Sequence, residues 1–239
     1  MTNKESENFP TSCDDCGSVG ESFFCNLHKT ELADLSVNKT HQSYKKGQII
    51  FHEGNQPFGL FCVSEGKIKI HKLGESGKDQ IVRFAKEGDI LGYRALLSSE
   101  TYSASATAME DTAICHITKN AFQKVLDASS SLMLKTITHL TQDLKGSEYK
   151  MMNMAQKPVR ERIAESLLML KGSFGVLEDG KTIDVILTRK EISDIAGATT
   201  ETTIRTLSDF KKDGVIEFNG KKVAILDIPE LTHIAKIFD

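Results

Sequence analysis

Short apolar runs separated by turn residues fill the first half of the chain. Six such runs recur between about His41 and Thr118, and glycines separate them; they span residues 48–51, 59–63, 67–70, 80–84, 90–91 and 113–117. Residues 64–67 have the pattern of a tight hairpin turn, because Gly66 tolerates a positive φ. Short strands at this spacing predict an all-β barrel or jelly roll.

After Asn120 the apolar period becomes helical. One stripe with 4-3-4-7 spacing occupies a and d positions of a heptad pattern, and it consists of Met133, Ile137, Leu140, Leu144 and Met151. The residues between them are mostly polar, so the stripe is narrow. It predicts a long helix that pairs with its counterpart in a second copy of the chain. Packing of the stripe on the chain's own barrel is the alternative.

The last third of the chain has the pattern of two short helices joined by a glycine. Thr188 and Glu191 fit a capping box at the start of the first helix, and Thr199 fits the cap of the second. Gly197 permits the tight turn between them. This pattern is typical of a helix-turn-helix.

Further elements are expected around this pair of helices. A helix is predicted from about Pro158 to Leu170, followed by a loop at 172–180 and a short strand at 183–187. Residues 215–218 and 223–226 predict a hairpin with a type I′ turn at Asn219-Gly220. The hairpin would make the unit a winged helix-turn-helix.

The second short helix carries side chains that suit base reading. Glu201 and Arg205 are four residues apart and share one helix face. Arg can donate two hydrogen bonds to guanine, and Glu can accept one from cytosine. A weak surface ion pair is the alternative. The predicted DNA-contacting residues are Thr188, Arg189, Thr199, Thr200, Glu201, Thr203 and Arg205.

Composition sets limits on these interpretations. The 239 residues are 39% hydrophobic and 26% charged, with a formal net charge of -3, as in an ordinary globular protein. Residues 155–239 hold 13 Lys and Arg against 14 Asp and Glu, so charge alone does not indicate nucleic acid binding. No apolar stretch is long enough for a membrane span, and Met1–Pro10 lacks a secretory core. A cytoplasmic protein without membrane contact is expected.

Three motifs together resemble the CRP/FNR family of transcription factors. They are Leu-Thr-Arg-Lys-Glu-Ile at 187–192 with Gly197, Thr-Glu-Thr-Thr-Ile-Arg-Thr-Leu at 200–207, and Gly-Asp-Ile-Leu-Gly at 88–92. The resemblance extends from about Leu32 to Asp227. It implies an α+β fold with a cupin-like double-stranded β-helix (jelly-roll) sensor barrel, a long dimerisation helix and a C-terminal winged helix-turn-helix. It also implies a homodimer on two-fold symmetric double-stranded DNA that contacts RNA polymerase.

The resemblance divides the chain into four parts. They are a cysteine-bearing N-terminal segment (1–30), a cyclic-nucleotide-binding-like barrel (31–120), the dimerisation helix (121–153) and the DNA-binding domain (154–239). One departure concerns the DNA site: Ile204 precedes Arg205 where FNR-type readers carry Ser and CRP carries Gly. The outer bases of the site are therefore expected to differ from both patterns.

The barrel also departs from cyclic-AMP receptors. Tyr93 stands in place of their ribose-binding Glu, and Tyr102-Ser103 in place of their phosphate-binding Arg-Ser. An anionic phosphate in this pocket would lack a neutralising guanidinium. The sequence therefore argues against a cyclic nucleotide.

The cysteines suggest a different signal. In a protein of this kind five cysteines favour metal or redox chemistry over structural disulfides. Cys13, Cys16 and Cys25 have C-x2-C-x8-C spacing, and Cys115 precedes the long helix. Oxygen-sensing FNR proteins hold a [4Fe–4S] cluster with three N-terminal cysteines and one barrel cysteine. They have five residues between their second and third cysteines, whereas this chain has eight.

Other interpretations of the cysteines remain open. Zinc binding with help from His28, a thiol switch, and no cofactor are the alternatives, and Cys62 is interpreted as a core residue. The histidines at 41, 52, 71 and 116 are scattered without a ligand motif, so no enzyme activity is expected. The alternative function is a regulator of the same family without a cofactor, whose barrel senses a small organic ligand.

Overall fold

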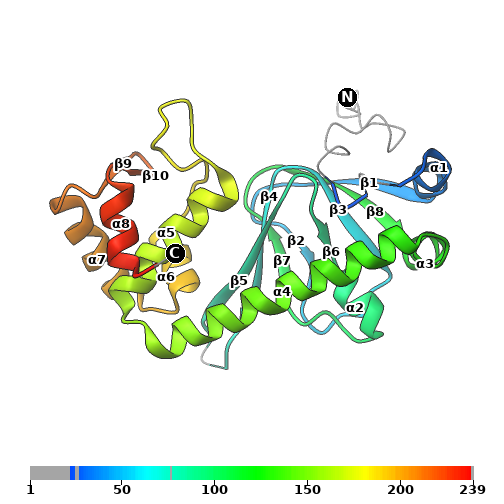
Figure 1. Cartoon of the computed structure of the whole chain (residues 1–239), viewed down its shortest axis with the longest axis horizontal. Helices are drawn as coiled ribbons and strands as arrows, with labels where there is room; N and C mark the ends of the chain where they lie inside the picture. Colours follow the sequence, from blue (N-terminus) through cyan, green and yellow to red (C-terminus); the bar gives the residue numbers. More distant parts are fainter. Residues whose placement is uncertain (1–21, 25–26, 76, 238–239) are drawn as a thin grey trace, which may run out of the picture. The chain divides into compact units, whose positions relative to one another are not determined.

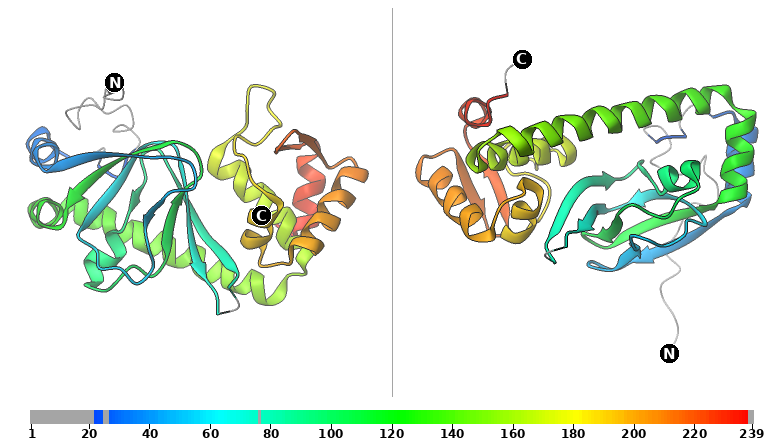
Figure 2. Two further views of the ribbon diagram at one scale, coloured as in Figure 1. Left: turned by 180° about the vertical axis from the view of Figure 1, so that it is seen from behind. Right: turned by 90° about the horizontal axis from the view of Figure 1, so that it is seen from below.

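The structure is a computed structural model that describes residues 22–24, 27–75 and 77–237 (Figure 1, with two further views in Figure 2). The chain forms two compact units. The first contains the described residues up to Lys72 together with Val82–Leu144, and the second contains Leu73–Ile81 together with the described residues from Lys145 onward. Among the described residues, no helix has the length and apolar character that a membrane span requires.

Two four-stranded sheets form the barrel, as the sequence predicts. Their strand orders are β1-β8-β3-β6 and β2-β7-β4-β5. The strands of the first sheet are β1 (Lys39–Tyr44), β8 (Thr112–Thr118), β3 (Gly59–Glu65) and β6 (Ile90–Leu91); those of the second are β2 (Ile49–Phe51), β7 (Ser105–Ala108), β4 (Lys67–Leu73) and β5 (Asp79–Lys86). All six predicted apolar runs form strands.

Two further strands, β1 and β7, lack the apolar signal that predicts a strand. Strand β1 reads Lys-Thr-His-Gln-Ser-Tyr, and none of its side chains is fully buried. It pairs along its whole length with β8, from Lys39 opposite Ile117 to Tyr44 opposite Thr112. Strand β7 consists of small residues, Ser-Ala-Thr-Ala, and the last three of them are buried. Pairing with apolar partners, rather than intrinsic preference, makes these segments strands.

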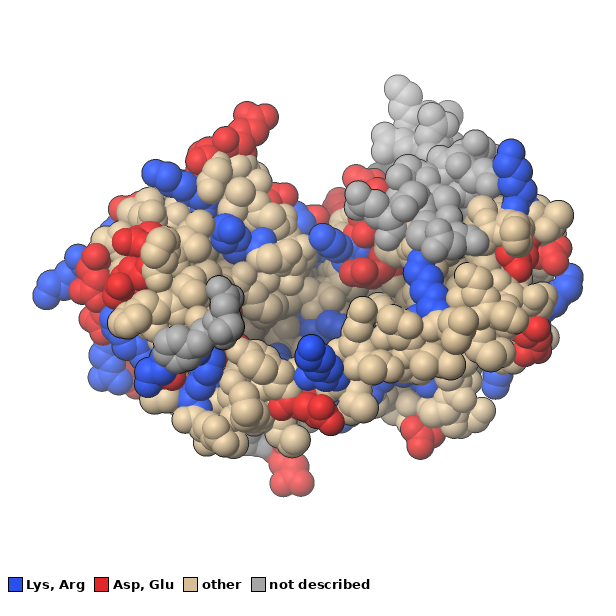
Figure 3. All heavy atoms as spheres, in the orientation of Figure 1, with Lys and Arg blue, Asp and Glu red and all other residues tan. Residues whose placement is uncertain are grey.

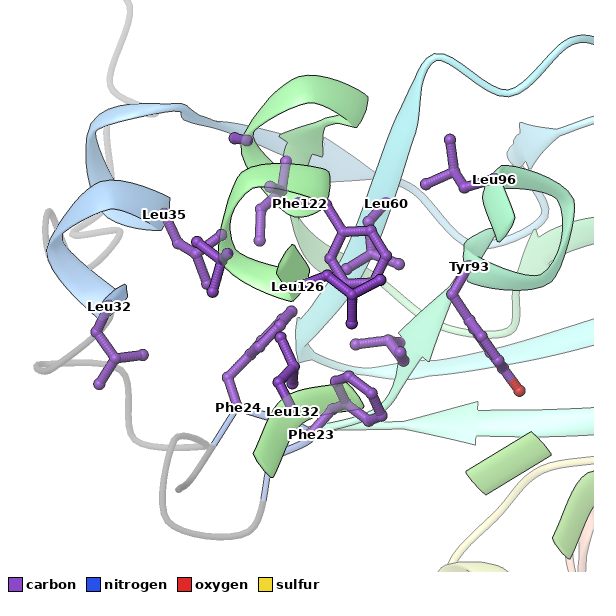
Figure 4. Packing of buried hydrophobic residues seen from close by; sticks show 14 residues of the cluster. Phe23, Phe24, Leu32, Leu35, Leu60, Tyr93, Leu96, Phe122, Leu126 and Leu132 are labelled. Atoms are coloured by element: carbon purple, nitrogen blue, oxygen red, sulfur yellow. The ribbon is translucent and has the colours of Figure 1, made fainter. Parts of the chain in front are cut away.

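The first sheet is covered on both faces. Successive side chains of a strand point to opposite faces, so Phe61 and Ile114 enter the core inside the barrel. Leu60 and Ile117 enter a second core on the outer face, where helices pack (Figure 4). This outer core also contains Phe23, Phe24, Leu32, Leu35, Phe122, Leu126 and Leu132.

The outer core is built by α1 (Lys29–Val37), α3 (Lys119–Ala128) and the first half of α4 (Ser130–Gln156). The sequence predicts one helix over 121–153, but the structure has two that meet at Ser129, whose backbone is extended (φ -117°, ψ 97°). Burial explains the break. Helix α3 has its own apolar face, with Phe122 and Leu126 in the outer core, while α4 adds Leu132 and a partly buried Leu140.

A polar contact also ties α4 to the barrel. Tyr93, the first residue of α2 (Tyr93–Ser98), donates a hydrogen bond from its hydroxyl to the Asp143 carboxylate. Arg83 of β5 lies 3.3 Å from the same carboxylate. Burial and the Asp143 charge raise the pKa of Tyr93, so its hydroxyl remains a donor at neutral pH.

The second unit is the expected winged helix-turn-helix. It contains α5 (Val159–Phe174), α6 (Arg189–Ala196), α7 (Thr200–Lys212), β9 (Ile216–Asn219), β10 (Lys222–Ile225) and α8 (Ile228–Ala235). The prediction of a strand at 183–187 is wrong. Only isolated bridges form there, from Ile183 to Val176 and from Thr182 to Ala224.

The wing turn differs from the prediction by one residue. Asn219 pairs with Lys222, so the two loop residues are Gly220 and Lys221. Gly220 has a positive φ of 62°, and Asn219 does not. A positive φ at only the first loop position excludes the predicted type I′ turn, which needs it at both, and fits type II′.

Truncation of Phe122 tests the outer core. Its ring is buried among α1, α3 and β3, so Phe122→Ala is expected to destabilise the first unit by about 3–5 kcal/mol. Urea unfolding followed by near-UV circular dichroism would measure the change. Gln123→Ala, an exposed change on the same helix, should shift stability by less than about 0.5 kcal/mol. Equal effects of the two changes would contradict this account of the core.

Candidate nucleic-acid interface and cysteine site

Capping interactions hold α6 and α7 in the helix-turn-helix. The Thr188 hydroxyl accepts from the Glu191 amide at 3.1 Å, and the Glu191 carboxylate accepts from the Thr188 amide at 2.9 Å. Gly197 ends α6 with a φ of 59°, and the Thr199 hydroxyl accepts from the Thr202 amide at 3.1 Å. The predicted capping box, glycine turn and second cap are therefore confirmed.

The first turns of α7 present polar side chains to solvent. Thr200, Glu201 and Arg205 are exposed. In the part of the chain that the structure describes, the Glu201 and Arg205 side chains have no ion pair or hydrogen bond with each other or with a neighbour. They are four residues apart on one face, which is the arrangement that base reading needs. Ile204 lies beside them and is 48% exposed.

Thr203 has a structural role instead of the predicted one. Its side chain has no exposed surface, and its hydroxyl donates to the Thr199 carbonyl at 3.0 Å. A side chain without exposed surface cannot touch a base or a phosphate. Thr203 is therefore removed from the set of predicted contacts with base methyls or phosphates.

Arg189 is held against the wing. Its guanidinium lies over the Phe218 ring of β9, with 3.9 Å between the guanidinium carbon and the ring centroid. Burial lowers the pKa of Arg189 from its usual value, yet a guanidinium stays charged in any protein environment. Stacking leaves the edges of the group available as donors while it fixes their direction. Phe218 was not singled out from the sequence, because nothing in the pattern pairs it with α6.

The charge of the C-terminal unit is mixed. Lys and Arg side chains alternate with Asp and Glu over the face seen in Figure 3. Several of the cations belong to ion pairs: Lys211 lies 2.8 Å from Glu217, and Lys222 lies 2.8 Å from Asp184. The nearly equal numbers of basic and acidic residues in 155–239 agree with this mixed surface charge. Recognition must therefore depend on individual side chains.

Cys115 lies in the middle of β8 on the outer face of the first sheet. His41 of β1 and Cys62 of β3 are its partners in the two neighbouring strands. The Cys115 Sγ lies 3.4 Å from the His41 Nδ1. Directly opposite residues of antiparallel strands point to the same face, so the three side chains form one row across the sheet. In the sequence His41 is one of several scattered histidines and Cys62 is interpreted as a core residue, because pairing partners are not visible in one sequence.

The three other predicted ligands, Cys13, Cys16 and Cys25, lie outside the described residues. Within the described ranges, no group of three or more His, Cys, Asp and Glu side chains could hold a metal ion. The described residues next to Cys25 pack on the same face as Cys115. Phe24 is buried in the outer core with Leu60 and Ile117.

Tyrosines stand at two positions where cyclic-AMP receptors bind the nucleotide, Tyr102 inside the barrel and Tyr93 in the outer core. Tyr102 stacks on Phe51 with ring centroids 4.1 Å apart. Burial raises the pKa of Tyr102 to about 12, so it is neutral. Tyr93 belongs to the outer core and bonds Asp143. Neither Tyr93 nor Tyr102 provides a positive charge that could neutralise the phosphate of a cyclic nucleotide.

The predicted helix stripe is largely exposed in the single chain. Met133, Ile137, Leu144 and Met151 are exposed, with Ile137 at 54% and Leu144 at 60%, whereas Leu140 is partly buried against the outer core. Two hydroxyls on this stretch bond to the helix backbone: Thr138 donates to the Leu134 carbonyl and Thr141 to the Ile137 carbonyl.

Comparison with known proteins agrees with this architecture. The cyclic nucleotide-binding domain family matches residues 41–129, and the Crp-like helix-turn-helix domain family matches residues 161–234. The transcriptional activator protein anr of Pseudomonas aeruginosa is 27% identical over 226 residues, covering 93% of this chain and 92% of that protein. The fumarate and nitrate reduction regulatory protein of Vibrio cholerae is 26% identical over 227 residues, covering 94% and 90%.

Solved structures show the same fold. FixK2 from Bradyrhizobium japonicum superposes with a TM-score of 0.74 at 25% identity, covering 82% of this chain and 96% of that one. A barrel domain, the helices that follow it and a Crp-like helix-turn-helix thus occur together in this chain and in its relatives. The chain belongs to the CRP/FNR family of transcriptional regulators, whose members bind DNA.

Proposed function

We propose that the protein is a homodimeric, sequence-specific DNA-binding regulator that responds to oxygen or redox state through a [4Fe–4S] cluster. Cys13, Cys16, Cys25 and Cys115 would hold the cluster. The position of Cys115 carries the proposal: it lies on the outer face of β8, on which Phe24 and Leu27 also pack. Four thiolates are the usual donor set of such a cluster.

The donor chemistry fits this group. Phe24 is buried in the outer core on the face of the sheet that carries Cys115, and Cys25 is the next residue in sequence. An iron–sulfur cluster supplies reactivity toward oxygen when it is bound. The His41 ring, 3.4 Å from Cys115, can hydrogen-bond to the sulfur and hold it in one orientation.

Contacts of the N-terminal segment with α4 support a route from this site to the helix stripe. The Lys135 ammonium lies 3.0 Å from the Ser22 carbonyl and 5.6 Å from the Phe23 ring centroid. The His139 ring lies 5.7 Å from the Phe23 ring. A change in the segment that bears Cys25 would therefore act directly on the N-terminal half of α4.

The exposed side of α4 supports a dimer. Ile137 and Leu144 are more than half exposed, and large apolar side chains at regular helical spacing favour burial by a partner. A second copy of the same helix offers the matching a/d pattern. Such a dimer would present two α7 helices to a two-fold symmetric DNA site.

The names of relatives agree with a redox signal. The Vibrio cholerae relative is named for the regulation of fumarate and nitrate reduction, which are redox reactions. Contact with RNA polymerase and residence in the cytoplasm are proposed here on the family resemblance alone.

Replacement of Arg205 tests base reading. Arg205→Ala should reduce discrimination between the preferred site and random DNA by about 1–3 kcal/mol, because the guanidinium donates to a guanine edge. Competition binding at fixed salt concentration would measure the loss. The control, Lys221→Ala at the wing tip, should weaken binding to all sequences alike. An equal loss on both DNAs for Arg205→Ala would make this residue a phosphate contact and contradict its proposed role.

Anaerobic purification tests the cluster. The protein should be brown and contain about four iron atoms and about four acid-labile sulfides per chain. Cys115→Ala should lose most of both, and Cys62→Ser should retain them, because Cys62 is outside the proposed donor set. A colourless wild-type protein without iron and sulfide would refute the cluster.

A charge on the exposed stripe tests the dimer. Ile137→Glu should raise the dimer dissociation constant at least about 100-fold, because an unpaired carboxylate would be buried at the interface. Analytical ultracentrifugation of the anaerobic protein would measure it. Gln142→Glu adds the same charge on the same helix outside the stripe and should leave the constant within about threefold. A monomeric wild-type protein, or equal effects of both changes, would reject this interface.

A further inference from the structure

Two cysteines face each other across neighbouring strands at the centre of the first sheet. Cys62 of β3 and Cys115 of β8 are direct partners in the antiparallel register. The residues on either side are also paired without interruption, Phe61 with His116 and Val63 with Ile114. The register irregularity of this strand pair begins only beyond Val63, so the two cysteines belong to the regular part of the ladder.

Regular pairing gives these residues the spacing that a disulfide requires. Directly opposite Cα atoms in antiparallel strands are about 4.5 or 5.5 Å apart, depending on the type of pair. Disulfides span Cα separations of about 4.4–6.8 Å. Both types of pair fall within this window. The side chains also share a face, so neither strand would have to rotate.

The two thiols differ in exposure, and this difference determines which of them reacts first with an oxidant. Cys115 is 6% exposed, and its sulfur is in contact with His41. Cys62 is half-buried and packs against the outer core. A small oxidant can therefore reach Cys62 before it reaches Cys115.

We propose that Cys62 and Cys115 form a disulfide when a peroxide oxidises the protein, so that the β3–β8 pair is a redox site that needs no metal. Cys62 attacks the peroxide; a sulfur–oxygen bond forms, the oxygen–oxygen bond breaks, and one water (or alcohol) leaves. Cys115 then attacks the Cys62 sulfur; the disulfide forms and the sulfenic oxygen leaves as water. Two thiols lose two electrons and two protons in total, and one peroxide is reduced.

The disulfide would affect the proposed cluster, because Cys115 is the one residue that belongs to both sites. A Cys115 sulfur held in a disulfide cannot act as a thiolate ligand. Peroxide would therefore prevent the N-terminal cysteines from completing a four-thiolate set, and a reductant would restore Cys115. The disulfide itself does not depend on whether the protein ever holds a cluster.

Cys62 and Cys115 fall in separate tryptic peptides, neither of which contains another cysteine, so the test is direct. Cys62 lies in peptide 47–67, Cys115 in peptide 95–119, and the three N-terminal cysteines together in peptide 5–29. The full-length protein is first reduced and freed of metal with a chelator, then treated with one equivalent of hydrogen peroxide and alkylated. Non-reducing digestion and mass spectrometry should find 47–67 joined to 95–119 in most molecules, and dithiothreitol should separate them.

Matched variants complete the experiment. Cys62→Ser, or Cys62→Ala if the first folds poorly, should abolish the linked pair, and Cys25→Ser should retain it. Linkage of 95–119 to 5–29, or peroxide oxidation of Cys62 to sulfinic acid without any linkage, would overturn the proposal. The metal-free experiment is independent of the cluster, because a wild-type protein without iron could still form the linked pair.

Discussion

The central strands of the first sheet, β3 and β8, carry apolar side chains on both faces, and the position of the cysteine site depends on this constraint. Successive residues of β3 and β8 point alternately into the barrel and toward the helices, so Phe61 and Ile114 fill the interior while Leu60 and Ile117 support α3 and α4. The same alternation puts Cys115 on the helix-facing side. A slip of one residue between β8 and its partners would move the thiol into the barrel, away from the face on which Phe24 packs.

The sequence pattern predicts most of the fold because most elements carry their own signals. Apolar runs between glycines identify six strands, and the caps at Thr188 and Thr199 identify the two short helices. Elements that depend on a partner are less visible. Strand β1 is polar and exists through its pairing with β8, and the helix break at Ser129 arises because α3 and α4 bury separate faces against the barrel.

The candidate sites were predictable to different extents for the same reason. Exposure of Glu201 and Arg205 follows from helical periodicity, because the apolar residues of α7 define the opposite face. The same periodicity puts Thr203 on the buried face, because Leu207 and Phe210 follow it by four and seven residues. The stacking of Arg189 on Phe218 and the row through His41 and Cys62 arise from tertiary pairing between distant segments. A single sequence contains no direct record of such pairing.

The threonines of α4 affect how its exposed side can be covered. Hydroxyls normally resist removal from water, because a buried donor without an acceptor is unfavourable by about 1–3 kcal/mol. Thr138 and Thr141 have already given their hydrogens to carbonyls one turn earlier in the helix. Toward a neighbour they present mainly methyl groups. A partner can therefore exclude water from this stretch of the helix without leaving a hydroxyl donor unsatisfied, although the amino-acid composition of the stretch is typical of a solvent-exposed surface.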